Sequence, residues 1–196
     1  PWFYSDGTRT QYRRSKSPSV DWAHWDNTLS NTFLRLEHQF ENDWSLHANF
    51  NHGEERVDSE LFTPSVGGYP SRGAGFAADD YPYILASHSK SQSNSLDFNA
   101  SGPFSLLGRR HEAVIGAMYS RRRESGNSTG RVDGSTVISD FDGFNGNYPR
   151  PDFDAIGYNS HSGAEYTQSG IYAALRFSLT DSLNLIAGGR FNNYES

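Results

Sequence analysis

The sequence predicts an all-β fold in which antiparallel up-and-down hairpins form part of a transmembrane β-barrel, with about six strands in this chain. Three segments alternate apolar and polar side chains along the chain. Very short turns close these hairpins, whereas long loops containing Gly and Pro connect one hairpin to the next. Short turns at one end and long loops at the other are typical of bacterial outer-membrane barrels.

The clearest hairpin covers residues 169–191. Its first strand places apolar side chains at every second position: Ile171, Ala173, Leu175, Phe177 and Leu179. Residues 180–182, Thr-Asp-Ser, form a turn because their side-chain oxygens can bond to nearby backbone. The return strand continues with Leu183, Leu185, Ala187, Gly189 and Phe191. A period of two predicts strands with one apolar and one mostly polar face.

Two further hairpins are predicted before it. In the first, a turn at 41–43 precedes the most regular strand of the chain, which carries Trp44, Leu46, Ala48 and Phe50. In the second, Gly102-Pro103 is expected to end a strand, and the turn runs to about Arg110. The return strand carries Ala113, Ile115, Ala117 and Tyr119. Its other face, with Val114, Gly116 and Met118, is too apolar for the pattern to decide which face is buried.

Residues 1–30 are predicted to be an ordered surface loop, and 52–90 and 121–165 to be long connecting loops. Loops of this length inside a compact domain are uncommon unless they are functional. Aromatic residues lie near both strand ends, as in the interfacial girdles of membrane barrels. These patterns favour a barrel over a soluble β-sandwich, which stays open as the alternative.

The composition restricts the classes of function. The net charge is −6 with acidic and basic residues interspersed, which argues against a nucleic-acid partner. The absence of Cys excludes disulfides, zinc–thiolate sites and thiol catalysis. No apolar run reaches the roughly 18 residues of a transmembrane helix, but barrel strands need only about 10 alternating residues. The chain has neither an initiator Met nor a signal peptide, so we expect an interior piece of a larger protein.

Several blocks of the sequence resemble TonB-dependent siderophore receptors, in the order in which the family has them. They are Tyr4–Thr10 (YSDGTRT), Asp21–Asp26 (DWAHWD), Asn31–His38 (NTFLRLEH), Gly102–Glu112, Gly143–Pro149 and Gly170–Phe191. The resemblance covers nearly the whole chain and is greatest to the receptors for ferric coprogen, rhodotorulic acid or pyoverdine.

This resemblance implies that residues 1–196 are a segment of the β-barrel domain of such a receptor. Family members are 22-stranded barrels of the outer membrane with a plugged lumen. They import a ferric siderophore with energy from the TonB complex, which reaches them through the plug. The plug, the TonB box and the other strands are not in this sequence. The implied partners are the ferric siderophore, outer-membrane lipid and lipopolysaccharide, and TonB. No cofactor is expected, because the siderophore carries its own iron.

The first loop supplies the candidate ligand-binding residues. The aromatic residues Trp2, Tyr4, Trp22 and Trp25 lie close in sequence, with Arg9, Arg13 and Arg14 between them. Aromatic faces and guanidinium groups suit a hydroxamate or catecholate chelate, through stacking and charge-assisted hydrogen bonds. The alternative is that these aromatic residues anchor the loop or belong to a girdle.

Other motifs predict no chemistry. The seven His residues show no ligand-like spacing, so no protein-bound metal is expected. Asp140, Asp142, Asn145 and Asn147 do not match a calcium loop and are interpreted as a solvated turn. No nucleophile elbow, phosphate-binding loop or acid–base pair is found, so an enzyme is not expected. Arg121–Arg123 is interpreted as a solvated rim facing lipopolysaccharide phosphates, with attraction of an anionic ligand as the alternative. A soluble, secreted carbohydrate-binding module is the alternative function.

Overall fold

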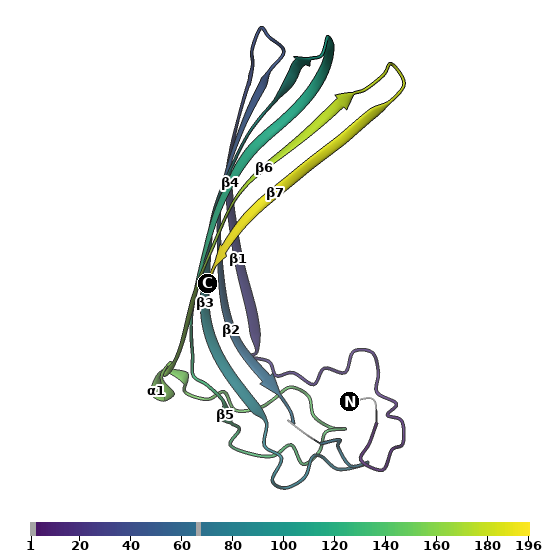
Figure 1. The fold of residues 1–196 in the computed structure, drawn as a ribbon. Coiled ribbons are helices and arrows are strands. Elements are labelled where there is room, and N and C mark those ends of the chain that lie inside the picture. The colour runs from purple at the N-terminus through teal and green to yellow at the C-terminus, as the bar shows by residue number, and fades with distance from the viewer. Residues whose placement is uncertain (1–2, 66–67) are drawn as a thin grey trace. The chain divides into compact units, whose positions relative to one another are not determined.

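The computed structural model describes residues 3–65 and 68–196, and places them in one antiparallel seven-stranded sheet with one short helix (Figure 1). The elements are β1 (His24–Gln39), β2 (Ser45–Thr63), β3 (Tyr83–Leu106), β4 (Arg109–Ser128), β5 (Val132–Asp133), α1 (Phe153–Ile156), β6 (Ser160–Ser178) and β7 (Asn184–Glu195). The strand order is β1-β2-β3-β4-β6-β7, and β5 pairs with β3. The long strands therefore neighbour one another in the sheet in the order in which they occur in the sequence, which is the up-and-down topology that the sequence predicts. The all-β fold class is confirmed.

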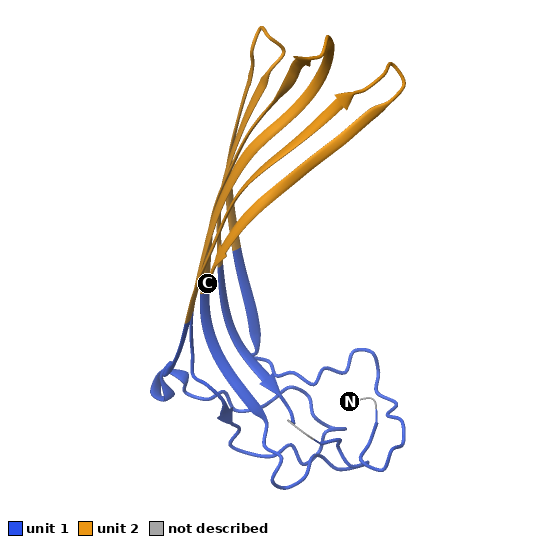
Figure 2. Cartoon of the chain, viewed as in Figure 1, with its two compact units in different colours: residues 1–28, 56–89, 126–162 blue, residues 29–55, 90–125, 163–196 orange. Residues whose placement is uncertain are grey.

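The chain divides into two compact units (Figure 2). Unit 1 comprises residues 1–28, 56–89 and 126–162, and unit 2 comprises residues 29–55, 90–125 and 163–196. Within the described ranges, no helix has the length and apolar content needed to cross a membrane. Unit 2 contains the short turns and the apolar parts of the long strands, whereas unit 1 contains the long loops.

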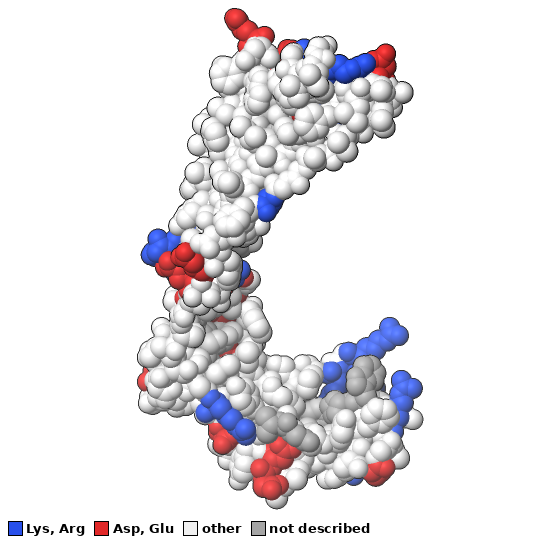
Figure 3. All heavy atoms as spheres, viewed as in Figure 1, with Lys and Arg blue, Asp and Glu red and all other residues white. Residues whose placement is uncertain are grey.

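One face of the sheet in unit 2 is apolar. Trp44, directly before β2, packs its ring over Gly102 of β3, where a Cβ atom would lie only 2.5 Å from the indole. In the β6–β7 ladder, Ile171 pairs with Phe191 and Ala173 with Gly189, so these alternating positions share that face. Figure 3 shows charged side chains of this unit at the short turns and in a second cluster at the other end of the strands, with few between the two. The face is therefore almost uncharged over most of the hairpins.

The opposite face of unit 2 is polar. Tyr172 of β6 lies over Gly116 of β4 and donates a hydrogen bond from its hydroxyl to Asp97 Oδ2 of β3, 3.2 Å away. Arg176 pairs with Glu112 at 3.3 Å on the same face. This settles the facing of β4, because Gly116 provides the space that the Tyr172 ring fills. Gly116 therefore lies on the polar face although it has no polar side chain.

The middle hairpin is longer than predicted. β3 continues through Gly102 and Pro103 to Leu106, and the turn is formed by Leu107 and Gly108, both with positive φ (53° and 75°). Two consecutive positive φ values are the signature of a type I′ hairpin turn, whose twist matches that of the strands. The strand tolerates Gly-Pro because the Trp44 indole covers Gly102 and donates a hydrogen bond to the Pro103 carbonyl at 3.0 Å.

The strands also extend further toward the long loops than the sequence pattern indicates. β1 begins at His24, β2 ends at Thr63 and β6 begins at Ser160. Side chains on neighbouring strands are paired in these extensions. For example, the hydroxyls of Ser59 on β2 and Ser87 on β3 form a hydrogen bond with their oxygens 2.8 Å apart. The long strands are therefore separated by fewer residues than predicted: β2 ends at Thr63 and β3 begins at Tyr83, while the segment between β4 and β6 runs from 129 to 159 and contains β5 and α1. The predicted first loop ends at residue 23. Residues 24–30 do not alternate in polarity, which is why a loop was predicted there.

Unit 1 has its own hydrophobic core although it consists largely of loop residues. The buried members come from three separate parts of the chain: Val20, Phe62, Phe76, Ile84, Ala86, Ile138, Phe141, Tyr148 and Phe153. Backbone bonds join the loops, including Phe76 N to Ile138 O at 2.9 Å. The buried aromatic rings pack at an angle to one another, as in Phe76–Phe141. The loops are therefore built to present a fixed surface.

Candidate functional site

A basic, aromatic-lined pocket of about 350 Å³ lies in unit 1. Its lining residues come from one short segment and one residue of the second long loop: Arg9, Thr10, Tyr12, Arg13, Arg14, Lys16, Pro18 and Phe141. Arg9, Arg13 and Arg14 are exposed, whereas Tyr12 and Lys16 are half-buried. Figure 3 shows basic side chains gathered on the part of unit 1 that includes this segment. The pocket thus combines a packed floor with a cationic rim.

Asp142 fixes the pocket segment to the second long loop. Its Oδ1 atom accepts hydrogen bonds from the hydroxyls of Tyr12 at 2.7 Å and Tyr4 at 3.2 Å, and its Oδ2 accepts from Gly73 N at 3.1 Å. Lys16 Nζ donates to the carbonyl oxygens of Asp142, at 3.1 Å, and of Phe144. One carboxylate and one ammonium group therefore connect three segments that are distant in sequence.

The aromatic floor is built by edge-to-face packing. The rings of Tyr4 and Tyr12 have their centroids 6.1 Å apart, and those of Tyr12 and Phe141 5.7 Å apart. Lys16 Nζ lies 5.4 Å from the centre of the Phe141 ring, and the Arg72 guanidinium 5.3 Å from that of Tyr4. Because Lys16 is held by carbonyls and rings, the exposed arginines are the cations best placed to meet a ligand.

The electrostatics of this cluster keep Tyr12 neutral and Asp142 charged. Burial, together with the hydrogen bond to Asp142, raises the pKa of the Tyr12 phenol. The Tyr12 hydrogen bond, with the Gly73 amide and the Tyr4 hydroxyl, lowers the pKa of Asp142 below its ordinary value of 3.8. The phenol therefore remains a hydrogen-bond donor and the carboxylate an acceptor at neutral pH.

We expect the packing of the pocket segment to depend on pH through Asp142. Because its pKa is lower in the folded state than in the unfolded state, the carboxylate stabilises the fold above pH 3.8. This contribution is lost as the pH falls below 3.8, where the folded carboxylate becomes protonated. Near-ultraviolet circular dichroism of the full-length receptor between pH 6 and pH 3 measures the loosening of the tyrosines. Asp142→Asn should remove this pH dependence, and an unchanged titration in Asp142→Asn would show that another group is responsible.

The structure separates the residues that the sequence grouped as ligand-binding. Arg9 lines the pocket. Tyr4 does not line it but donates a hydrogen bond from its hydroxyl to Asp142, which also binds Tyr12 of the pocket. Trp22 packs into the core, with ring contacts to Phe62 and Phe153, and donates a hydrogen bond to the Tyr148 carbonyl at 2.8 Å. Trp25 lies in β1 with 66% of its surface exposed, and it does not line the pocket. Trp2 lies outside the described residues.

Sequence reasoning missed the role of the second long loop. Phe141 and Asp142 were interpreted as part of a solvated turn, and the Asp140 carboxylate does accept from Gly143 N at 2.9 Å as in such a turn. Their contacts to Tyr4 and Tyr12 span more than a hundred residues, and no local pattern indicates them. Over residues 3–65 and 68–196, no three His, Asp or Glu side chains converge as metal ligands do.

Comparisons with known proteins place this geometry in a family. The family model described as TonB dependent receptor-like, beta-barrel matches residues 1–196. The ferric-pyoverdine BN7/BN8 receptor of Pseudomonas putida is 35% identical over 201 residues, which cover 100% of this chain and 24% of that protein. The ferripyoverdine receptor of Pseudomonas aeruginosa PAO1 is 32% identical over 197 residues, covering 99% of this chain and 23% of that protein.

Solved structures agree with the sequence comparison. The pyoverdine outer membrane receptor FpvA from Pseudomonas aeruginosa PAO1, bound to pyoverdine, superposes with a TM-score of 0.82 at 28% identity. The match covers 99% of this chain and 27% of that chain. The chain thus spans about a quarter of the length of its curated relatives. These relatives are receptors, so neither an enzyme nor a soluble carbohydrate-binding module is favoured. The chain belongs to the TonB-dependent receptor family, as a segment of its β-barrel.

Proposed function

We propose that the protein of which this chain is part is an outer-membrane receptor that binds a ferric siderophore of the pyoverdine class and imports it with energy from TonB. The observation that carries this proposal is the basic, aromatic-lined pocket on the loop unit of a TonB-dependent receptor barrel. The named relatives, which are ferric-pyoverdine receptors, support the same class of ligand.

The pocket has the chemistry to hold a metal chelate without acting on it. The half-buried Tyr12 ring, packed edge-to-face on the buried Phe141 ring, offers aromatic surface, and the rim arginines offer guanidinium donors to chelate oxygens. The siderophore brings its iron fully ligated, so the protein supplies contacts and no metal ligand. Binding at the loops and transport by the plugged barrel are separate steps, and the residues of this chain serve the first.

The apolar face of unit 2 supports a position in the outer membrane. It begins near the short turns with the packed rings of Phe104, His111 and Phe177. Along β4 it continues at every second residue to Tyr119, eight residues from His111, or about 26 Å at 3.3 Å per residue. An outward apolar band about 25 Å tall with aromatic borders is the mark of a membrane-spanning barrel.

Removing the cations of the pocket rim should weaken siderophore binding. We expect the triple variant Arg9→Gln, Arg13→Gln, Arg14→Gln of the full-length receptor to bind ferric pyoverdine about tenfold more weakly. Exposed ion pairs contribute about 0.2–1 kcal/mol each, and 1.4 kcal/mol is a factor of ten. Quenching of tryptophan fluorescence by the ferric siderophore, measured at low and high salt, gives the affinity. The difference between variant and wild type should shrink at high salt.

Arg131→Gln is the matched control, because Arg131 also lies in unit 1 but pairs with Asp133 at 2.7 Å, away from the pocket. It should leave the affinity unchanged. Equal affinities for the triple variant and the control would exclude the pocket as the binding surface. Transport is tested by measuring iron uptake through the wild-type receptor in cells with and without TonB. Equal uptake in the two would exclude the transport proposal.

A further inference from the structure

The arginines on the rim of the unit 1 pocket carry charge that the described chain does not compensate. Arg9, Arg13 and Arg14 are exposed, and over residues 3–65 and 68–196 no ion pair to any of them is found. Arg131 of the same unit, by contrast, pairs with Asp133 at 2.7 Å. Among the described residues, none that lines the pocket is acidic. The rim is therefore suited to an anion supplied from outside the chain.

The backbone that carries these arginines is held in place. Lys16 N donates a hydrogen bond to Arg13 O at 2.9 Å, which closes a turn that contains Arg14. Farther along the segment, Asp21 N donates to Gly146 O of the second long loop at 3.1 Å. Because the backbone is fixed, only the arginine side chains must be ordered when a ligand binds, which limits the entropic cost. The rim is therefore a preformed surface.

The pocket is small for a whole ferric siderophore. Its volume of about 350 Å³ lies at the lower end of the range for drug-sized ligands, which is about 300–1,000 Å³. A siderophore that surrounds iron with its ligand groups is at least as large as a drug. The pocket therefore encloses one part of the complex, and the rest of the complex lies outside it.

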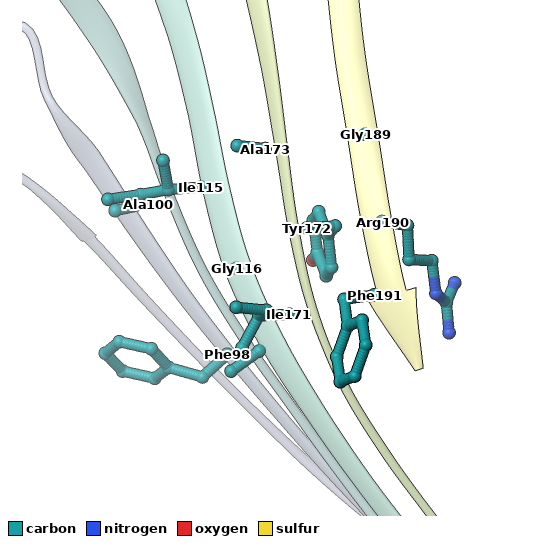
Figure 4. Close-up of a pocket in the computed structure, with 11 residues that line it drawn as sticks. Phe98, Ala100, Ile115, Gly116, Ile171, Tyr172, Ala173, Gly189, Arg190 and Phe191 are labelled. Carbon is teal, nitrogen blue, oxygen red and sulfur yellow. The ribbon is translucent and has the colours of Figure 1, made fainter. Parts of the chain in front are cut away.

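The larger hollow of unit 2 does not suit a charged group. Its volume is about 620 Å³, and its lining is almost entirely apolar. Figure 4 shows Phe98, Ala100 and Ile115 on one side of the sheet, with Arg190 on the other side. An anion placed against the apolar side would have no cationic partner there. Of these two hollows, only the pocket of unit 1 fits an anionic group.

The charge and the shape of the rim favour a free carboxylate. Iron shares the charge of the oxygens that ligate it, whereas a carboxylate that does not ligate iron keeps its full charge and both oxygens. Guanidinium groups pair with such a carboxylate through two parallel hydrogen bonds. We propose that the pocket is a specificity site for an acidic arm of the siderophore, with the carboxylate on the rim arginines and the carbon chain against the Tyr12 ring. This inference rests on the proposed function and adds which siderophores the receptor prefers.

The acidic arm is tested with two forms of ferric pyoverdine that differ in one group. One form carries an arm that ends in a free carboxylate, and the other carries the corresponding primary amide, which has nearly the same shape and no charge. We expect the full-length wild-type receptor in detergent to bind the acid form about tenfold more tightly, which corresponds to about 1.4 kcal/mol. Quenching of tryptophan fluorescence gives both affinities. The preference should shrink at high salt, because the charges are exposed.

A double-mutant cycle assigns this preference to the rim. In the triple variant Arg9→Gln, Arg13→Gln, Arg14→Gln, the acid and amide forms should bind within about twofold of each other, because the partner of the carboxylate is gone. Arg131→Gln is the matched control and should keep the full preference, since Arg131 pairs with Asp133. A triple variant that loses the same affinity for both forms would show that the arginines contact the chelate itself, and would overturn the acidic-arm site.

Replacing the same three arginines by lysine tests the shape of the contact. Lysine keeps the charge but cannot form two parallel hydrogen bonds to one carboxylate, so the preference for the acid form should fall to about threefold. A preference as large as that of the wild type would show that charge alone attracts the ligand. That result would overturn a carboxylate seated on the guanidinium groups.

The acidic-arm site and the proposed function fail in different ways. A wild-type receptor that binds both forms with equal affinity contradicts only the acidic-arm site, because siderophore binding itself is then intact. A wild-type receptor that binds neither form contradicts the proposed function, and the acidic-arm site with it.

Discussion

Replacing Trp22 by alanine is expected to destabilise the loop unit by about 3 kcal/mol while leaving the strands of unit 2 folded. The Trp22 ring contacts Phe62 and Phe153, and its indole N–H is bonded to the Tyr148 carbonyl at 2.8 Å. Truncation of a core Trp to Ala costs about 3–5 kcal/mol, and the half-burial of Trp22 places it at the low end. Hydrogen exchange in the full-length receptor should show lost protection at backbone amides of unit 1.

Two variants separate anchoring from ligand binding. Trp22→Phe keeps a ring in the core and loses the indole hydrogen bond, so about 1 kcal/mol is expected. Trp25→Ala removes a side chain that is 66% exposed and should change stability by less than 1 kcal/mol. If Trp22→Ala weakens siderophore binding without loss of amide protection, Trp22 contacts the ligand directly. If Trp25→Ala weakens binding, the ligand also reaches β1.

The hairpins could be predicted from the sequence where one face of the sheet is apolar. The strand ends that lie beyond this apolar face were wrongly predicted to be loops. Alternation from Trp44 to Phe50 and from Ile171 to Phe177 marks the band that needs an apolar face. Beyond the band the strands continue to pair, but their side chains no longer alternate regularly between apolar and polar. His24 and Asp58, bonded at 2.9 Å on β1 and β2, are such a pair. Strand pairing of this kind has no periodicity in the sequence, so these residues were predicted to be loops.

The candidate site was predictable only in its local part. The run Arg9–Lys16 is concentrated in sequence, so its charge could be read directly, although Lys16 was not singled out. The floor of the pocket depends on Phe141 and Asp142, which lie more than a hundred residues from this run in the sequence and contact it only in the folded chain. Trp22 shows that a residue can also be assigned to the site wrongly from its sequence neighbours. Its type and spacing suggested a ligand contact, but its burial depends on Phe62 and Phe153, which are distant in sequence.

Replacing Leu46 by arginine is expected to destabilise the full-length barrel by about 2–4 kcal/mol, the cost of Arg near the middle of a lipid-facing band. Leu46 lies between Trp44 and Phe50 on the apolar face of β2. His47→Arg is the matched control, because His47 is the next residue and points to the polar face. There His47 Nδ1 lies 3.4 Å from Glu37, which an arginine can also pair with. Guanidinium titrations of the receptor folded in phospholipid vesicles measure both free energies.

A cost at Leu46 alone does not distinguish lipid from a second protein sheet, since Arg is unfavourable in either surrounding. Spin labels at 46, 48 and 50, compared with labels at 45, 47 and 49 in the same receptor, provide that distinction. Against lipid, the even positions should be open to oxygen, which partitions into the bilayer, and closed to a water-soluble nickel chelate. Against a second sheet they should be closed to both. Equal accessibility of the odd and even labels would contradict the two-faced strand that the pairing of Trp44 with Gly102 and of Ser45 with Ser101 indicates.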